Sequence, residues 1–273
     1  MPELPEVETI AKSLRLGGMT GEPIINRQIR SVDLFNPNTL IFDGTEEECG
    51  DALNGARILS VDRRAKYLRI LTDKLWILIH LRMSGDLRCE PDDPETLQKH
   101  DRMVFRFQDG FRLVFNDVRK FGRIWVTHDP GSVLSGLGIE PLGGELTPEW
   151  IRNGLAQQHR AIKAILLDQE FIAGIGNIYA DESLFAAGIL PTRPGCSLNA
   201  DECGRLCTAI RETLLHAIEQ NGSSFDWAYK GGHFQNEFKV YQRTGEPCPR
   251  CGAPIERIRI AQRGTHFCPH CQT

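Results

Sequence analysis

Four cysteines near the C-terminus constrain the fold of this chain more than any other feature. They form two pairs, Cys248-x-x-Cys251 and Cys268-x-x-Cys271, separated by sixteen residues. Two such pairs joined by a short return of the chain offer four thiolates to a tetrahedral Zn²⁺. Unligated buried cysteines are the alternative, but the Pro-Arg and Pro-His dipeptides inside the pairs favour the metal. Because protein would fill all four positions, we expect one structural zinc ion.

Length and composition bound the class of protein. A chain of 273 residues favours about two domains, and 41% hydrophobic with 25% charged residues is ordinary for a globular protein. No apolar run approaches the ~20 residues that span a bilayer. The start, Pro-Glu-Leu-Pro-Glu, lacks the features of a secretory signal. We therefore expect a cytoplasmic protein without a membrane segment. The remaining cysteines are expected to be small core residues: Cys49, Cys89, Cys196, Cys203 and Cys207.

Charge is segregated along the chain. The net charge of −4 argues, taken alone, against a nucleic-acid partner. However, acidic residues concentrate in Asp43 to Asp51 and Glu90 to Glu95, which we interpret as solvated loops. Basic residues gather elsewhere, with seven Lys or Arg against three Glu from Lys230 onward. Two further basic clusters are Arg63, Arg64, Lys66 and Arg69, and Arg102, Arg106, Arg112, Arg119, Lys120 and Arg123. They indicate either a phosphate-binding surface or ordinary solvated faces.

The apolar pattern predicts two kinds of structure. Residues 3–16 carry apolar side chains at helical spacing, and Gly17-Gly18 ends the helix. From about 24 to 127, short strands follow, with Asp109-Gly110 as a hairpin turn. The predicted strands are Tyr67 to Leu71, Leu75 to Leu81, Met103 to Phe107 and Phe111 to Phe115. This part therefore reads as an antiparallel sandwich.

The second half is predicted to be helical. Helical stretches cover Pro148 to Gln157, Arg160 to Gln169, Asn177 to Ala187 and Asp201 to Gln220. A small strand module with the cysteines follows Phe238. We predict an α+β protein with a sandwich domain at 1–127, a linker at 128–147 rich in Gly and Pro, a helical domain at 148–237 and a cysteine module at 238–273.

Two local motifs could contact an anion. Arg263 lies in the segment between the cysteine pairs, where a metal-stapled hairpin would present its guanidinium fork to a phosphate. A solvent-facing turn would look similar. Ala173-Gly-Ile-Gly-Asn177 joins two helices, and Asn177 could cap the second and form an anion site. A plain turn between helices is the alternative.

The N-terminus offers a nucleophile. Removal of Met1 would expose the secondary amine of Pro2, and a terminal amine has a pKa near ~8, so part of it is unprotonated at neutral pH. Glu3 and Glu6 are three residues apart and can share one helix face. Such an amine can attack a sugar carbon while a carboxyl group donates a proton. An ordinary helix start with acids favouring its dipole is the alternative.

Five motifs together resemble the formamidopyrimidine-DNA glycosylase family. They are Met1-Pro-Glu-Leu-Pro-Glu-Val-Glu-Thr, His80-Leu-Arg-Met-Ser-Gly85, Asn116-Asp-Val-Arg-Lys-Phe-Gly122, Gly174-Ile-Gly-Asn-Ile-Tyr-Ala-Asp-Glu182 and the cysteine module. They occur in the family's order from the first residue to the last. The resemblance implies a β-sandwich with a catalytic N-terminal helix, a helix-two-turn-helix domain and a C-terminal zinc finger.

The resemblance also implies roles for individual residues. Pro2 would attack C1′ of a damaged nucleotide, Glu3 would supply a proton, and Glu6 would support the same site. Lys66 and Arg263 would serve the same site through phosphate contacts. The other expected DNA-binding residues are His100, Lys163, Asn177 and Tyr179.

An enzyme acting on a base inside a duplex must flip it out and fill the hole. By resemblance, Met83 would occupy the void, Arg119 would face the orphaned base and Phe121 would wedge between neighbouring bases. By residue type alone, Met83 and Phe121 would simply be core residues.

The family implies a monomeric DNA-repair enzyme that excises oxidised purines and nicks the strand, with double-stranded DNA as partner. The segment after Ser223-Ser224 departs from the commoner pattern, which leaves the reading of the flipped base open. One alternative is a glycosylase of the endonuclease VIII type, which prefers oxidised pyrimidines. Another is a zinc-finger protein that binds damaged DNA without catalysis.

Overall fold

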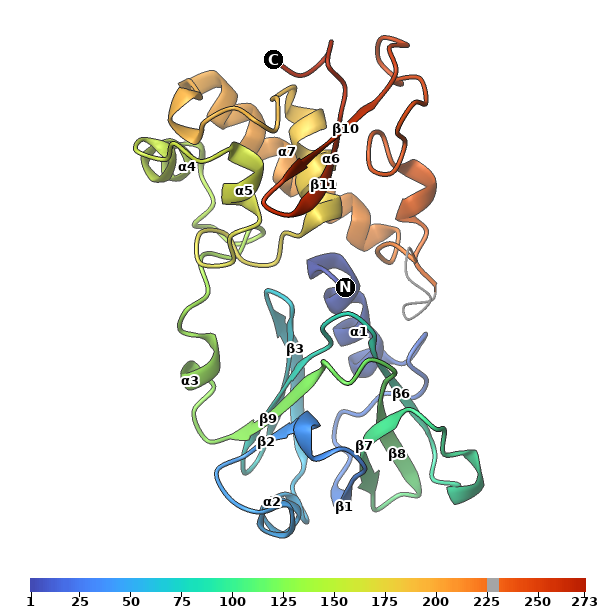
Figure 1. The fold of residues 1–273 in the computed structure, drawn as a ribbon. Helices are drawn as coiled ribbons and strands as arrows, with labels where there is room; N and C mark the ends of the chain where they lie inside the picture. Colours follow the sequence, from blue (N-terminus) through green and yellow to red (C-terminus); the bar gives the residue numbers. More distant parts are fainter. Residues whose placement is uncertain (225–230) are drawn as a thin grey trace. The chain divides into compact units, whose positions relative to one another are not determined.

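The computed structural model describes residues 1–224 and 231–273. The first half of the departing segment after Ser224, residues 225–230, therefore lies outside the described residues. The contacts divide the described chain into two compact units, one of residues 1–135 with 223–224 and 231–232, the other of 136–222 with 233–273. Figure 1 draws the elements of both. Among the described helices, none combines the length and apolarity required to cross a membrane.

The first unit is a sandwich of two sheets preceded by a helix. The sheets have strand orders β1-β7-β8-β6 and β2-β9-β5-β4-β3. The helices are α1 (Leu4–Leu16), α2 (Glu46–Leu53) and α3 (Gly131–Leu134), with short 3-10 turns at Pro37–Thr39 and Pro94–Thr96. The strands are β1 (Ile29–Leu34), β2 (Leu40–Ile41), β3 (Ile58–Arg64), β4 (Tyr67–Thr72), β5 (Trp76–His80), β6 (Gly85–Pro91), β7 (Asp101–Phe107), β8 (Phe111–Asp117) and β9 (Arg123–Thr127).

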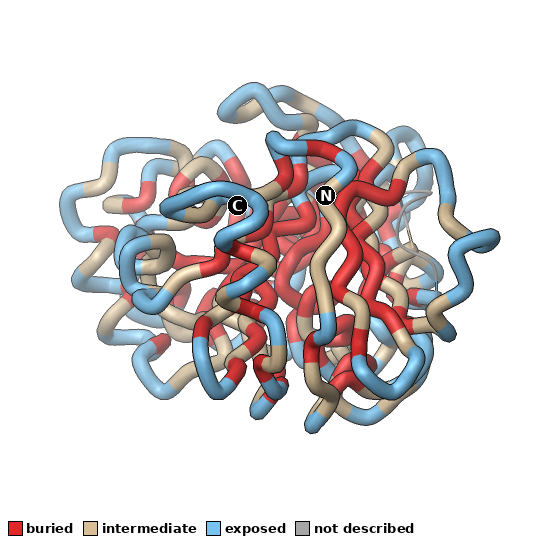
Figure 2. The backbone as a smooth tube through the Cα atoms, turned by 90° about the horizontal axis from the view of Figure 1, so that it is seen from below, coloured by how far each residue is buried: buried red, intermediate tan, exposed pale blue. Residues whose placement is uncertain are grey.

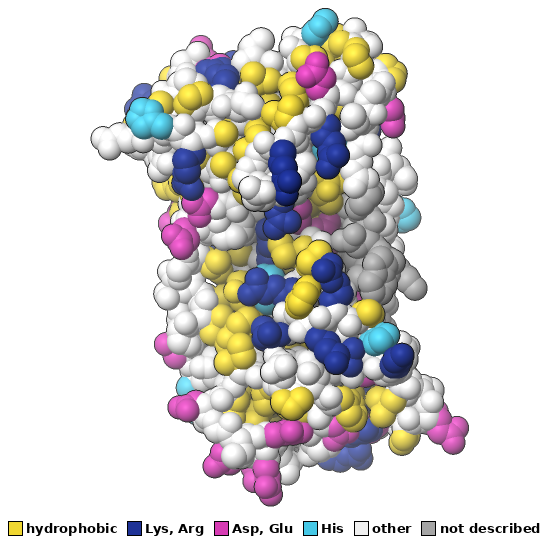
Figure 3. Space-filling model, in the orientation of Figure 1, with side chains coloured by type: hydrophobic (Ala, Val, Ile, Leu, Met, Phe, Trp, Pro, Cys, Tyr) yellow, Lys and Arg dark blue, Asp and Glu magenta, His cyan; other side chains and the backbone are white. Residues whose placement is uncertain are grey.

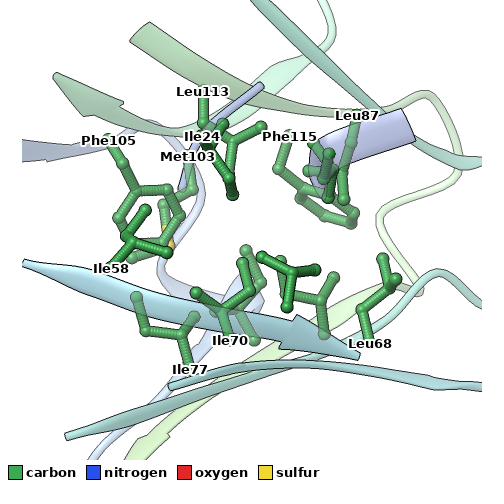
Figure 4. Packing of buried hydrophobic residues seen from close by; sticks show 14 of the residues in the cluster. Ile24, Ile58, Leu68, Ile70, Ile77, Leu87, Met103, Phe105, Leu113 and Phe115 are labelled. Atoms are coloured by element: carbon green, nitrogen blue, oxygen red, sulfur yellow. The ribbon is translucent and has the colours of Figure 1, made fainter. Parts of the chain in front are cut away.

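The core of this unit lies between the two sheets. Side chains such as Phe105 and Leu113 from one sheet point toward Ile70 and Ile77 from the other (Figure 4). Successive strand residues alternate between faces, so every second residue is buried, as in β4. Figure 2 marks the buried positions in red. Helix α1 packs its apolar stripe, which includes Val7, into the same core beside β3 and β4. The core thus fixes the position of the helix that follows Pro2.

The structure confirms the predicted sandwich but corrects three details. Asp43 to Asp51 is not a loop, because Glu46–Leu53 forms α2, which Thr45 and Glu48 cap reciprocally. Glu90 is not in a solvated loop either, because it lies in β6 with its carboxylate bound to Arg112. Strands β2 and β9 pair in parallel, whereas their neighbours are antiparallel. In the first stretch Glu48 takes part in a helix cap, and in the second Glu90 takes part in an ion pair, so neither acidic stretch is simply a solvated loop.

The second unit is helical with a two-stranded hairpin. Its elements are α4 (Pro148–Leu155), α5 (Ile162–Leu166), α6 (Asn177–Ala187), α7 (Ala200–Glu219), 3-10 turns at Gly195–Ser197 and Phe234–Glu237, β10 (Glu256–Ile260) and β11 (Arg263–Phe267). Helix α6 packs against α7, and β11 packs against α6. The predicted helix at Arg160 to Gln169 is shorter in the structure, and the other three agree within two residues. Asn177 is the first residue of α6 rather than its cap, which is Gly176.

Candidate active site and nucleic-acid contacts

Two buried carboxylates stand at the start of α1, directly after Pro2. Glu3 is the N-cap residue, and its backbone N–H donates to Oε2 of Glu6 at 2.7 Å, while the Glu3 side chain accepts from the backbone N–H of Glu6. This reciprocal capping box satisfies backbone donors that a helix start otherwise leaves open. Both side chains are at most 4% exposed, and Pro2 is buried as well. A potential nucleophile and two acids are therefore held on one rigid helix end.

Glu6 also reaches a distant part of the chain. Its second oxygen, Oε1, accepts the backbone N–H of Ser223 at 2.8 Å. Beside this contact, the backbone N–H of Gly232 donates to Oγ of Ser224 at 2.6 Å. Glu6 thus binds the backbone at Ser223, two residues before the segment that departs from the family's commoner pattern.

Lys66 lies in the turn between β3 and β4 and is buried. Close to it is His80, a titratable residue that our sequence reasoning quoted only as part of a motif. Burial, and then the positive charges of Arg82 and Lys66, lower the pKa of His80 to about 3. Nδ1 of the neutral ring accepts the backbone N–H of Arg82 at 3.0 Å. At neutral pH the imidazole of His80 near Lys66 is therefore uncharged.

The residues expected to fill a void in DNA are at the surface. Met83 is 41% exposed and Phe121 47%, so the interpretation of both as core residues is wrong. Arg119 is exposed too, and its guanidinium lies 5.0 Å from the centre of the Phe121 ring. Single exposed apolar side chains are ordinary on a protein surface, whereas a contiguous group of them marks a surface that a partner contacts. Figure 3 shows yellow apolar side chains standing among dark blue Lys and Arg on one face.

Only part of the second basic cluster is available to a partner. Arg112 has a fully buried side chain, which binds Glu90, and Arg106 pairs with Asp33. Arg102 is buried and donates to the backbone carbonyl of Asp117. These three arginines hold the sandwich together and do not form a phosphate-binding surface. Arg119 and Lys120 are exposed.

Lys163 lies in the interior of the second unit. Its ammonium is 2.7 Å from Oδ1 of Asp181, and both side chains are fully buried. It also donates to the carbonyl of Gly264 and to Oγ1 of Thr265, both at 2.9 Å. Oδ2 of Asp181 accepts the backbone N–H of His266 at 2.9 Å. In this arrangement Lys163 joins helix α5 and helix α6 to the hairpin and is not presented at the surface.

The other expected contacts of this unit lie in the hairpin or in α6, which packs against it. Nδ2 of Asn177 donates to the carbonyl of Gly264 at 3.0 Å. Tyr179 is fully buried, with its ring 5.6 Å from that of Phe234. Arg263 is exposed and follows the turn of Ala261 and Gln262, which have φ angles of 47° and 61°. Two successive positive φ angles are typical of a tight hairpin turn.

A recess of about 370 Å³ lies beside Asn177. Besides Asn177 it is lined by Tyr241, Gln242, Thr244, Arg257, Gly264 and His266. No sequence pattern singles out Tyr241 or His266, and Asp181 is visible in the sequence only as part of the Gly174 to Glu182 motif. Asp181 and His266 are 85 residues apart in sequence, so no local motif could join them.

The four C-terminal cysteines converge as predicted. Their sulfur atoms all lie within 4.8 Å of one another, with 3.9 Å between Cys248 and Cys271 and 3.5 Å between Cys251 and Cys268. Tetrahedral Zn–S bonds of about 2.3 Å require sulfur separations of this size. The cluster is therefore the site of one structural zinc ion. Of the other cysteines, Cys196 is only half-buried and lies 3.5 Å from Nδ1 of His159, so the expectation of a core position is wrong for it.

Comparison with known proteins places these features in a family. The chain matches the family models described as formamidopyrimidine-DNA glycosylase N-terminal domain at residues 1–124, formamidopyrimidine-DNA glycosylase H2TH domain at 137–228, and zinc finger found in FPG and IleRS at 245–273.

Relatives and solved structures agree with these models. Formamidopyrimidine-DNA glycosylase of Laribacter hongkongensis is 42% identical over 280 residues, with all of both chains covered. A Lactococcus lactis Fpg complex with FAPY-dG containing DNA superposes with a TM-score of 0.89 at 36% identity, covering 99% of this chain and 100% of the other. A complex of the same enzyme with abasic site containing DNA has the same TM-score and identity, covering 99% of each. The chain belongs to the formamidopyrimidine-DNA glycosylase family.

Proposed function

We propose that this protein excises oxidised purines from double-stranded DNA and then cleaves the strand at the abasic site, with the amine of Pro2 as nucleophile. The observation that carries the proposal is the placement of two buried carboxyl groups on the helix end that directly follows Pro2. Membership of the family and its DNA complexes supply the substrate class. We further propose a cytoplasmic monomer, divided into domains at 1–127, 148–237 and 238–273.

The chemistry needs a processed N-terminus. While Met1 is attached, the nitrogen of Pro2 is an amide and cannot attack; once Met1 is removed, it is a secondary amine. The free amine attacks C1′ of the flipped nucleotide, and the base leaves with the bonding electrons and takes up a proton. Ring opening then requires a proton on the sugar oxygen, which Glu3 donates, and leaves an iminium between Pro2 and C1′.

Strand cleavage follows from the same intermediate. The iminium withdraws electrons and acidifies C2′, so loss of that proton expels the 3′ phosphate, and a second elimination expels the 5′ phosphate. Hydrolysis of the iminium releases the sugar remnant and restores the amine. Glu6 accepts two backbone N–H groups and therefore holds Glu3 and Ser223 in place for these steps.

DNA binding is assigned to both units. Met83 and Phe121 supply apolar surface for the void and the wedge, and Arg119 offers hydrogen-bond donors to the orphaned base. Lys66 and Arg263 contact phosphates of the damaged strand, and His100 and Asn177 are further contacts. Lys163, being buried, supports the hairpin that carries Arg263, and Tyr179 is buried in α6, the helix that packs against β11.

Borohydride trapping tests the nucleophile. Reduction of the iminium joins the protein irreversibly to abasic DNA, and we expect the wild type to be trapped. Pro2→Gly replaces the secondary amine held by the proline ring with a flexible primary amine and should reduce the trapping rate by about 100-fold or more, the scale expected for a misplaced catalytic group. Pro130→Gly, at the start of α3, serves as a control and should be trapped normally. Normal trapping by Pro2→Gly, or mass spectrometry showing Met1 on fully active protein, would overturn the mechanism.

Substrate choice separates the alternatives. Excision from duplexes carrying 8-oxoguanine opposite cytosine should exceed excision of thymine glycol opposite adenine. The reverse order would indicate an enzyme of the endonuclease VIII type. Binding without any trapped product would indicate a protein that recognises damage without catalysis.

A further inference from the structure

We propose that the buried carboxylate of Asp117, together with Ser84, joins the loop that carries Met83 to the turn that carries Arg119 and Phe121, so that the three side chains enter DNA as one rigid wedge. This inference rests on the proposed function, because it assigns a purpose to the exposure of those side chains. Asp117 and Ser84 would be positioning residues, since neither is at the surface.

The topology brings the two segments together. Residues 81–84 connect β5 to β6, and residues 118–122 connect β8 to β9. Strands β5 and β9 are paired in one sheet, and β6 and β8 are paired in the other. Both segments therefore connect the same two sheets, and they do so at the same end of the strands. At the start of β6, Gly85 is directly opposite Asp117.

One carboxylate is shared by the two segments. Asp117 is 1% exposed, and its Oδ1 accepts the hydroxyl of Ser84. The same oxygen accepts the backbone N–H of Arg119 at 3.1 Å, and Oδ2 accepts the backbone N–H of Gly122 at 2.7 Å. The N–H of Arg119 also lies 3.1 Å from Oγ of Ser84. The side chain of Asp117 therefore cross-links the two segments through three hydrogen bonds.

The ring of Phe115 packs against the backbone at Gly85 and at Gly122. A Cβ atom added to Gly122 would come within 2.4 Å of Cζ of Phe115, and one added to Gly85 within 3.0 Å of Cε2 of the same ring. At Gly85 the added atom would also lie 2.5 Å from the carbonyl oxygen of Leu81, and real Cβ atoms do not approach other heavy atoms to less than 3.0 Å, so both positions require glycine. The two backbones therefore pack against neighbouring atoms at the outer end of a single buried ring.

Strained backbone lies next to each exposed side chain. Arg82, which precedes Met83, has φ 54°, and Lys120, between Arg119 and Phe121, has φ 60°. Residues with side chains adopt this region only where their surroundings impose it, and such strain gathers at functional sites. The bonds to Asp117 provide that constraint for residues 118–122.

The carboxylate is itself fixed by its own backbone. The N–H of Asp117 donates to the carbonyl of His100 at 2.9 Å, and its carbonyl accepts Nε of Arg102 at 2.7 Å. Arg102 also lies 3.1 Å from Nδ1 of His100. The cluster thus connects three segments that carry expected DNA contacts, and Asp117 is at its centre.

The test separates insertion of the wedge from chemistry. A duplex with a non-cleavable abasic analogue and 2-aminopurine as the neighbouring base reports unstacking as a rise in fluorescence. Borohydride trapping on single-stranded abasic DNA reports the chemistry without base flipping. Asp117→Asn replaces one acceptor by a donor that faces other donors and should lower the unstacking rate about tenfold or more. Trapping on the single strand should stay within about twofold of wild type, because α1 does not depend on this cluster.

Two further variants complete the design. Ser84→Ala removes only one hydroxyl and should lower the unstacking rate about fivefold, which keeps the test valid if Asp117→Asn folds poorly. Asp129→Asn is the matched control, because the carboxylate of Asp129 also binds a backbone N–H, that of Gly131, in an exposed turn. We expect wild-type behaviour from it.

Each outcome decides one question. Wild-type unstacking by both Asp117→Asn and Ser84→Ala would overturn the inference while leaving the proposed function intact. Equal loss of unstacking and of single-strand trapping in both variants would overturn it too, because the effect would not be specific to the wedge. Failure of the wild type to be trapped would instead overturn the proposed function.

Discussion

His80 shows how the surroundings of one residue set its charge. Its ring is buried, lies 4.6 Å from the ring of Tyr67 edge to face, and accepts the backbone N–H of Arg82 through Nδ1. Protonation would remove that acceptor and place a charge in a dry site beside two cations, which is why the pKa of His80 falls to about 3. An ordinary histidine has a pKa of about 6.5. The difference links this residue to the stability of the protein.

Stability should therefore depend on His80 in acid. Above pH 6.5 the ring is neutral in both the folded and the unfolded chain; below it, only the unfolded chain takes up the proton. The free energy of unfolding then falls by about 1.4 kcal/mol per pH unit until the folded pKa is reached. Between pH 6.5 and pH 5, proton uptake by His80 in the unfolded chain lowers the free energy of unfolding by roughly 2 kcal/mol.

Urea unfolding at pH 7 and pH 5 measures this contribution. Asparagine can accept the N–H of Arg82 but does not titrate. Between pH 7 and pH 5 the free energy of unfolding of His80→Asn should therefore fall by about 2 kcal/mol less than that of the wild type. Equal losses in the two proteins would show that the histidine is not kept neutral by the fold.

The hairpin β10–β11 depends on supports outside itself. A two-stranded hairpin alone is marginally stable in water. Here the zinc cysteines flank it, Lys163 and Asn177 bind its Gly264 carbonyl, and Asp181 binds the N–H of His266. Because Arg263 is on this element, its position is only as firm as those supports.

Loss of the metal should therefore remove DNA binding. A structural zinc ion contributes on the order of 10 kcal/mol or more to folding of a small module, far above what a hairpin provides alone. Cys251→Ser should bind less than one zinc ion per chain and lose most of its affinity for abasic duplex DNA. Cys196→Ser, outside the cluster, is the control and should keep both. Metal content by mass spectrometry and DNA binding by fluorescence anisotropy provide the measurements, and wild-type values for Cys251→Ser would contradict the prediction.

At the scale of the whole molecule, net charge says little about the partner. The chain has a formal charge of −4, yet many of its charged groups pair with each other internally, as where Glu90 binds Arg112 and Asp181 binds Lys163, and these pairs are not presented to a partner. The cations left at the surface, including Arg119 and Arg263, decide what an approaching polyanion meets. For DNA binding, the local distribution of charge at the surface therefore matters more than the net charge of the chain.

Binding to duplex DNA should weaken steeply with salt despite the negative net charge. Each phosphate neutralised contributes about −0.9 to the slope of log K against log salt concentration. Arg263→Gln should make the slope shallower by about one, whereas Arg30→Gln, whose guanidinium pairs with Asp92, should not. Anisotropy titrations over a series of salt concentrations test this. A slope near zero for the wild type would contradict binding through phosphates.

Sequence alone determined what depends on near neighbours. The helix after Glu3, the Asp109-Gly110 hairpin and the zinc pairs follow from capping, turn and ligand rules that act over a few residues. The resemblance added the family, because its motifs retain their order. The prediction of a loop at Asp43 to Asp51 is wrong, although Thr45 and Glu48 provide a local cap signal for α2.

Only the tertiary structure decided which of these residues are exposed and which share a partner. Met83 and Phe121 look like core residues in the sequence but stand at the surface, whereas Lys163 looks like a surface cation but is fully buried against Asp181. The position of Asp117 between two crossing segments was equally hidden. The physical reason is that burial and charge pairing depend on segments tens of residues apart, which no local pattern of spacing can bring together.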